Sequence, residues 1–153
     1  MCQNEKRGFT LVELVVVIMI IAILGAIAAP RLLGTRKNAL DSQSIKALNN
    51  VRNAIAMYVA ENGGQLPGAD GSETTFKSDV GEYLRGPFPR ANVGPMASDT
   101  AKNNMVGMTN RNETLIGSSA ADTGWKYSYT NGEFIINFDG PTVADPDLNY
   151  DDL

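Results

Sequence analysis

The sequence predicts an α+β fold in which one long N-terminal helix packs on a small C-terminal antiparallel sheet. Two observations carry this prediction. A nearly uncharged apolar stretch at residues 9–30 runs directly into an amphipathic stretch at residues 31–62, and both have helical character. Near the C-terminus, residues 125–138 have the pattern of two short strands around Asn131 and Gly132, a pair favoured in tight hairpin turns.

The apolar stretch has the length of a membrane-spanning helix. From Phe9 to Pro30 it contains 22 residues, and Glu13 is its only charged residue. At about 1.5 Å of rise per residue, such a helix reaches roughly 30 Å, the thickness of a bilayer core. A cleaved secretory signal would have a shorter apolar core. A plain signal anchor, with Glu13 near the membrane interface, is the alternative that the residues alone leave open.

Residues 31–62 predict the amphipathic second half of the same helix. Apolar residues recur there on one face at helical spacing, and Gly63 follows Asn62 as a stop signal. Pro30 removes one backbone donor, so it would either kink the helix or divide it. Because the helical period continues beyond Pro30, we expect one helix of about 50 residues. Two helices broken near residues 30–34 are the alternative.

Residues 63–153 predict a variable loop followed by the sheet. The first part is rich in Gly, Pro, Asn and Ser, which favours loops and turns. In the hairpin, Trp125 should be a large buried contact on the long helix. The candidate elements before the hairpin are a short helix at residues 75–84 and short strands at residues 105–108 and 114–117.

The start of the chain carries a specific pattern. Two basic residues are followed by Gly8, Phe9 and, four residues later, Glu13 at the head of the apolar stretch. This segment closely resembles the class III signal of type IV pilins and type II secretion pseudopilins. The resemblance implies a type IV pilin-like fold, whose long helix packs against a small C-terminal sheet.

The resemblance also implies roles for these residues. A prepilin peptidase would cut after Gly8, which removes residues 1–8 as a leader, and would methylate the new amino terminus of Phe9. Residues 9–30 would first anchor the chain in the membrane and later form the filament core. In the filament, Glu13 of one subunit would meet the Phe9 amine of its neighbour, so assembly would neutralise a charge that a lone protomer leaves unpaired.

The C-terminal segment is acidic and contains a pattern of oxygen ligands. Alternate residues from Asp145 to Asp151 resemble the spacing that opens a calcium loop, although the turn glycine and the last glutamate of an EF-hand are missing. Major pseudopilins often bind calcium with C-terminal carboxylates. A solvated flexible tail is the alternative. The candidate calcium ligands are Asp139, Asp145, Asp147, Asn149 and Asp151.

Composition argues against several classes of function. The chain has no histidine, so it cannot build a His-ligated zinc site or a His-dependent catalytic triad, and we expect no enzyme. Its net charge of −4 argues against nucleic acid as a partner. Cys2, the only cysteine, lies in the leader. Many type IV pilins carry a C-terminal disulfide, so a mature chain without cysteine favours the pseudopilins.

The resemblance therefore predicts a structural filament subunit, similar to the major pseudopilin of a type II secretion machine. It implies a location in the inner membrane with the C-terminal domain in the periplasm, and then in a periplasmic filament. The implied partners are further copies of the chain, the prepilin peptidase, the inner-membrane secretion platform and the minor pseudopilins. A type IV pilin for adhesion, motility or DNA uptake is the nearest alternative, and a signal-anchored periplasmic enzyme or binding domain is a remote one.

Overall fold

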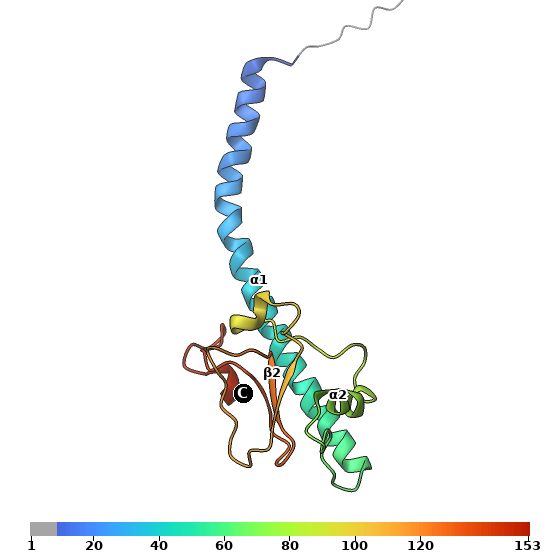
Figure 1. The fold of residues 1–153 in the computed structure, drawn as a ribbon. Coiled ribbons are helices and arrows are strands. Elements are labelled where there is room, and N and C mark those ends of the chain that lie inside the picture. The colour runs from blue at the N-terminus through green and yellow to red at the C-terminus, as the bar shows by residue number, and fades with distance from the viewer. Residues whose placement is uncertain (1–8) are drawn as a thin grey trace, which may run out of the picture. The chain divides into compact units, whose positions relative to one another are not determined.

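The computed structural model describes residues 9–153, except for the side chains of residues 28–34. It divides into two compact units, of which the first ends at Lys37 and the second spans Asn38–Leu153. The elements, in chain order (Figure 1), are α1 (Leu11–Glu61), α2 (Glu73–Gly81), the 3-10 helix η1 (Gly94–Ser98), β1 (Val106–Thr109), β2 (Trp125–Ser128), β3 (Phe134–Ile136) and the 3-10 helix η2 (Tyr150–Asp152).

Helix α1 is a single element of 51 residues that continues through Pro30, so the prediction of one long helix is confirmed. The helix ends at Glu61, next to the stop signal that the sequence predicts at Asn62 and Gly63. The backbone N–H of Gly64 donates to the carbonyl of Val59 at 2.9 Å. Gly63 has a φ of +64°, a left-handed conformation that glycine adopts without steric cost.

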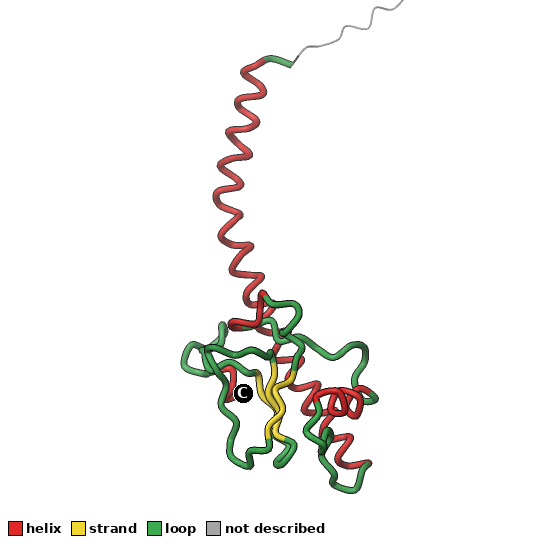
Figure 2. The backbone as a smooth tube through the Cα atoms, in the orientation of Figure 1, coloured by secondary structure: helices red, strands yellow, loops and turns green. Residues whose placement is uncertain are grey.

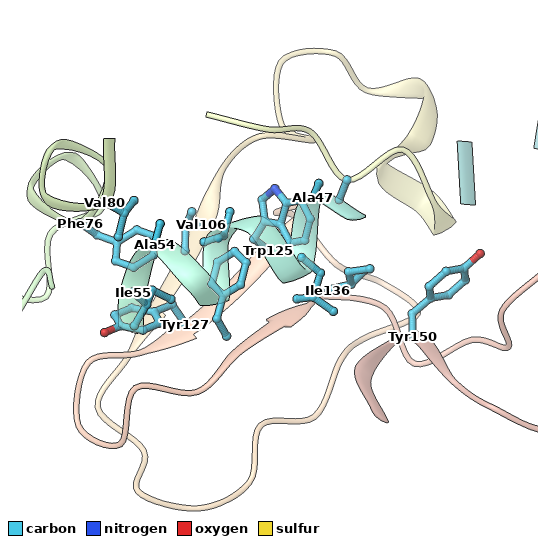
Figure 3. Close-up of a cluster of buried hydrophobic side chains, with 14 of the residues drawn as sticks. Ala47, Ala54, Ile55, Phe76, Val80, Val106, Trp125, Tyr127, Ile136 and Tyr150 are labelled. Atoms are coloured by element: carbon cyan, nitrogen blue, oxygen red, sulfur yellow. The ribbon is translucent and has the colours of Figure 1, made fainter. Parts of the chain in front are cut away.

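The core of the second unit lies between one face of α1, helix α2 and the sheet (Figure 3). Trp125 and Tyr127 of β2 are both 0% exposed, which confirms Trp125 as a buried contact. Its indole N–H donates to the carbonyl of Pro89 at 3.0 Å. Each fully buried large apolar side chain stabilises the fold by about 1.5–3 kcal/mol. The residues that α1 contributes to this core are Ala47, Leu48, Val51, Ala54 and Ile55.

The predicted α+β fold, with a long N-terminal helix and a small C-terminal sheet, is confirmed, but the sheet is mixed, so the prediction that it is antiparallel throughout is wrong. Its order is β1-β2-β3, and the three strands lie side by side within a unit made largely of loops (Figure 2). Strand β2 pairs antiparallel with β3, but β1 pairs parallel with β2, with Val106 opposite Trp125. Residues 110–124 separate β1 from β2, and a connection of that length allows the chain to return and enter β2 in the same direction.

The predicted hairpin is present, but its turn is longer than two residues. Tyr127 pairs with Phe134, and the N–H of Ser128 donates to the carbonyl of Glu133 at 2.9 Å, so residues 129–132 form the connection. A two-residue type I′ turn requires a positive φ at both central residues. Gly132 has a φ of +79°, whereas no non-glycine residue in the described chain has a positive φ. Asn131 therefore cannot take its place in such a turn.

A loop rather than a strand occupies the region predicted as a strand at residues 114–117. This loop, residues 110–121, is bound to the outer face of the sheet, the face turned away from α1. The ammonium of Lys126 donates to the carbonyl of Ile116 at 2.9 Å, and the N–H of Leu115 donates to Glu133 Oε2 at 2.8 Å. Side chains alternate along a strand, so Lys126 lies on the face opposite Trp125 and Tyr127.

Candidate functional site

Helix α1 begins at a capping box formed by Thr10 and Glu13. The Thr10 backbone N–H donates to Glu13 Oε2 at 3.0 Å, and the Thr10 hydroxyl donates to the same oxygen at 2.8 Å. In return, the Glu13 backbone N–H donates to Thr10 Oγ1 at 3.3 Å. The two residues thus satisfy backbone donors that have no partner within the helix. This arrangement fixes the first helical residue at Leu11 and holds the carboxylate on the first turn, where the helix dipole favours negative charge.

The helix that follows this cap exposes apolar side chains on every side. All described residues from Leu11 to Ile27 are exposed in the single chain, and their large apolar side chains range from 42% exposed at Val15 to 78% at Leu11. Phe9, which precedes the cap, is 74% exposed. A helix that is apolar all round is normally buried in lipid or within an assembly. The exposed apolar surface of residues 11–27 is therefore of the kind that lipid or another protein covers.

Part of the predicted site lies outside the described residues. This applies to Gly8 and the rest of the leader at residues 1–8, and to the side chains of residues 28–30 at the end of the predicted span 9–30. Within the described part of the chain, no helix is both long enough and apolar enough to cross a membrane.

The C-terminal segment folds back on the second unit instead of forming a flexible tail. Pro141 and Asn149 form an antiparallel β-bridge, and the N–H of Tyr150 donates to the carbonyl of Gly140 at 3.0 Å. Tyr150 is only 2% exposed, and its hydroxyl donates to Asp41 Oδ1 of helix α1 at 2.5 Å. The end of the chain is thereby attached to α1.

Several of the predicted calcium ligands are exposed or bonded to the protein's own backbone. Asp139 and Asp147 are exposed, and the N–H of Asp147 donates to Asp145 Oδ1 at 3.1 Å. Asp151 Oδ2 accepts a bond from the N–H of Gly117 at 2.8 Å, which commits that oxygen to the protein backbone. Among the residues that the structure describes, no group of three or more Asp, Glu, His or Cys side chains is arranged to hold a metal ion. Calcium binding by these residues stays a prediction.

Two polar residues of structural importance escaped the sequence reasoning. Thr10 could have been found, because Thr-x-x-Glu before an apolar run is the pattern of a capping box. Asp41 is the second, because a charged residue on an amphipathic helix ordinarily predicts exposure, yet Asp41 is only 3% exposed. Its partner Tyr150 is 109 residues away, so no local signal announces the pair.

Residues 3–29 match the family described as the prokaryotic N-terminal methylation motif. The chain begins with a prepilin-type methylation motif. The match includes Phe9 and both members of the Thr10–Glu13 capping box. The methylation motif therefore includes all the described exposed apolar residues of α1 from Leu11 to Ile27.

The chain is also similar to components of a type II secretion system and of a type IV pilus. It is 36% identical over 59 residues to the type II secretion system core protein G of Escherichia coli K12, covering 39% of this chain and 41% of that relative. It is 46% identical over 60 residues to the type IV wide pilus major component PilA4 of Thermus thermophilus, covering 39% of this chain and 46% of that relative. The core protein G of Aeromonas hydrophila is 34% identical over 62 residues, covering 40% and 43%.

These similarities concern only part of each protein. Each alignment spans less than half the length of the relative that it matches. No solved structure matches the chain. Beyond the methylation motif and the aligned segment, the role of the chain has to be inferred from its own geometry.

Proposed function

We propose that this chain is a structural filament subunit of a type II secretion machine, with the role of a major pseudopilin. A prepilin peptidase cuts after Gly8 and methylates Phe9. Residues 9–30 anchor the chain in the inner membrane with the second unit in the periplasm, until subunits polymerise through α1 into a periplasmic filament. The inner-membrane secretion platform and minor pseudopilins are the further partners. The chain performs no catalysis in this scheme.

The observation that carries this proposal is a methylation motif at the head of a helix whose apolar side chains from Leu11 to Ile27 are all exposed in the single chain. Lipid would cover these side chains before assembly, and the helices of neighbouring subunits would cover them afterwards. The same apolar surface would thus be covered both in the membrane-anchored chain and in the assembled filament. This explains why the apolar stretch has no polar face and no polar interruption.

Glu13 has a specific part in this proposal. Removal of Gly8 leaves Phe9 with a free amine whose ordinary pKa is near 8, so the amine is cationic at neutral pH. Both bonds that Thr10 donates end on Glu13 Oε2. A neighbour's amine can therefore approach Oε1 while the capping box stays intact. In surroundings of low dielectric constant, this charge pair would be far stronger than in water.

A pair of substitutions separates the charge of Glu13 from its capping role. Glu13→Gln keeps an acceptor for Thr10 but removes the charge, whereas Glu13→Ala removes both. We expect both variants to insert into the membrane and both to lose filaments when each is the sole subunit. Thr10→Val, which breaks the cap and keeps the charge, is the matched control and should retain filaments. Normal filaments from the Glu13→Gln chain would refute the pairing.

Intact mass analysis of the protein purified from its native host tests the processing step. We expect a chain that starts at Phe9 and carries one additional methyl group. A chain that still starts at Met1 would leave an ordinary membrane anchor and would overturn the proposal.

A type IV pilin is the second candidate, and the 46% identity to the wide pilus component of Thermus thermophilus favours it. The two candidates predict different losses in a deletion strain. Retention of folded exoproteins in the periplasm would support the secretion subunit. Loss of surface fibres, adhesion, motility or DNA uptake with secretion intact would support the pilin.

A further inference from the structure

A pocket in the second unit lies between the end of α1, the loop at residues 64–70 and helix α2. It has a volume of about 430 Å³, which is in the size range of sites for small ligands. Tyr58 of α1 and Tyr129, which follows β2, supply aromatic rings to its wall, and Asp70 and Asp79 supply carboxylates. No lysine or arginine is among the described residues that line it. We refer to this hollow as the Asp79 pocket.

A buried hydroxyl without a partner lies next to this pocket. Tyr127 is 0% exposed, and within the described chain its hydroxyl has no hydrogen-bond partner. Its ring packs on Phe76 of α2, one helical turn before Asp79, with 4.3 Å between the ring centroids. Figure 3 shows the hydroxyl at the end of the core where Phe76 and Val80 lie, away from Tyr150. A buried polar group ordinarily has a partner, so an unpaired one calls for an explanation.

The groups that the Tyr127 hydroxyl faces belong to the pocket. Burial raises the pKa of Tyr127, and the nearby Asp79 and Tyr58 raise it further. Burial and the charge of Asp79 also raise the pKa of Tyr58, so both hydroxyls stay protonated at neutral pH. The N–H of Gly68 donates to Asp79 Oδ2 at 2.9 Å, which holds the carboxylate at the pocket and leaves Oδ1 as a further acceptor. One charged oxygen and two hydroxyl oxygens therefore face one another where the pocket meets the core.

This set of oxygens fits a cation that donates hydrogen bonds. The carboxylates of the pocket repel anions, and a divalent metal ion prefers several carboxylate ligands to neutral hydroxyls. A primary ammonium has one positive charge and three N–H donors, so one carboxylate oxygen and two hydroxyls can accept all three of its bonds. The rings of Tyr58 and Tyr129 would contact the methylene groups beside the ammonium and attract its charge.

We propose that the Asp79 pocket binds a primary alkylammonium group, whose three N–H donors are accepted by Asp79, Tyr58 and Tyr127. This site goes beyond the proposed filament role and does not depend on it. The Tyr127 hydroxyl gains the partner that it lacks in the single chain. A free aliphatic amine and the side chain of a lysine both carry the group that this site recognises.

Isothermal titration calorimetry of the full chain in detergent tests the site with n-butylammonium as the probe. At constant ionic strength we expect saturable binding to one site. Tyr127→Phe should weaken this binding at least about ten-fold, because the variant loses an acceptor for a charged donor. The same variant should melt at the same temperature as the unaltered chain or higher, because it removes a buried hydroxyl without a partner. Tetramethylammonium, which has the charge but no N–H donor, should also bind at least about ten-fold more weakly.

Tyr150→Phe is the matched control for Tyr127→Phe. The Tyr150 hydroxyl donates to Asp41 at the other end of the core, so this variant should lose stability but bind n-butylammonium with unchanged affinity. Asp79→Asn keeps a side-chain oxygen as an acceptor but removes the charge, and it should weaken binding at least about ten-fold. Asp122→Asn removes an exposed charge before β2, at the opposite end of the strand from the pocket, and should leave binding unchanged.

N-acetyl-lysine amide separates the two sources of the alkylammonium group. Tighter binding of this compound than of n-butylammonium assigns the pocket to a lysine side chain, and weaker binding assigns it to a free amine, so either order supports the site. The inference would be overturned if the unaltered chain bound neither compound saturably, or if Tyr127→Phe bound n-butylammonium as tightly as the unaltered chain. Neither of these results would affect the proposed function, which the Glu13 variants test through filament formation.

Discussion

The bond between Tyr150 and Asp41 leads to a quantitative prediction about what holds the C-terminal segment in place. Tyr150→Phe removes the hydroxyl that donates to Asp41 Oδ1 at 2.5 Å and keeps the ring, which lies 5.8 Å from the ring of Phe138. Asp41 is 3% exposed, so its carboxylate would lose this donor in a place that water scarcely reaches. A hydrogen bond to a charged group contributes about 1.5–3 kcal/mol, and a buried charge left behind adds its own penalty.

We therefore expect Tyr150→Phe to lower the free energy of unfolding by about 2–3 kcal/mol. At about 4 °C of melting temperature per kcal/mol for a domain of roughly 100 residues, the midpoint should fall by about 8–12 °C. Trp125 is the only tryptophan and is 0% exposed, so its fluorescence reports unfolding of the second unit in the full chain held in detergent.

Asp41→Leu supplies the other arm of a double-mutant cycle. Each single variant leaves one partner of the bond behind, whereas the double variant with Tyr150→Phe leaves neither, so the double variant should be more stable than the sum of the single losses implies. Melting midpoints of Tyr150→Phe within 2 °C of the unaltered chain, or losses that simply add, would show that this bond does not hold the segment in place.

Three further predictions follow from other features of the second unit. Burial, together with the bond to Asp41, raises the pKa of Tyr150 above its unfolded value of about 10. The protonated hydroxyl therefore stabilises the fold fully below pH 10, and this stabilisation is lost as the pH rises further. Alkaline titration should accordingly unfold the chain above pH 10, and less steeply in Tyr150→Phe. Gly124→Ala should lower the free energy of unfolding by about 1–3 kcal/mol, because the new Cβ would lie 2.1 Å from the carbonyl oxygen of Asn103. Gly81→Ala, whose Cβ would meet nothing within 4 Å, should leave the free energy of unfolding unchanged or raise it. If the predicted calcium site exists, calcium at 100 times its dissociation constant should raise the free energy of unfolding by about 2.7 kcal/mol. Asp151→Asn should reduce this gain. Identical melting curves in calcium and in chelator would contradict the calcium site.

Local patterns in the sequence predict the elements that depend on local contacts. The helical period across Pro30 predicts α1, and the alternation around Trp125 predicts the β2–β3 hairpin. The burial of Trp125 follows from its size and its place on the inward face of a strand. In each case the residues that decide the structure are close together in the chain.

Features decided by distant residues could not be predicted in this way. The parallel pairing of β1 with β2 depends on the path of residues 110–124, which have no periodicity. The burial of Asp41 depends on a tyrosine near the other end of the chain, and a charged residue on a helix otherwise predicts exposure. The same limit applies to the candidate site, where the motif at residues 3–29 includes Phe9 and Glu13 but says nothing about the surfaces of the second unit.

The position of the cap at Thr10 also affects how a protease would reach the chain. Phe9 and Thr10 precede the first helical residue, and the first helical hydrogen bond runs from the N–H of Leu14 to the carbonyl of Thr10 at 3.3 Å, so Phe9 lies before the hydrogen-bonded turns. Proteases generally act on extended backbone, and a helix that began two residues earlier would enclose the bond to be cut. In the proposed scheme, the boundary that Thr10 imposes would let a fully helical apolar segment lie in lipid while Phe9, on the carboxyl side of the bond to be cut, stays outside the helix. Maturation and anchorage would then use adjacent stretches of chain that do not compete for the same conformation.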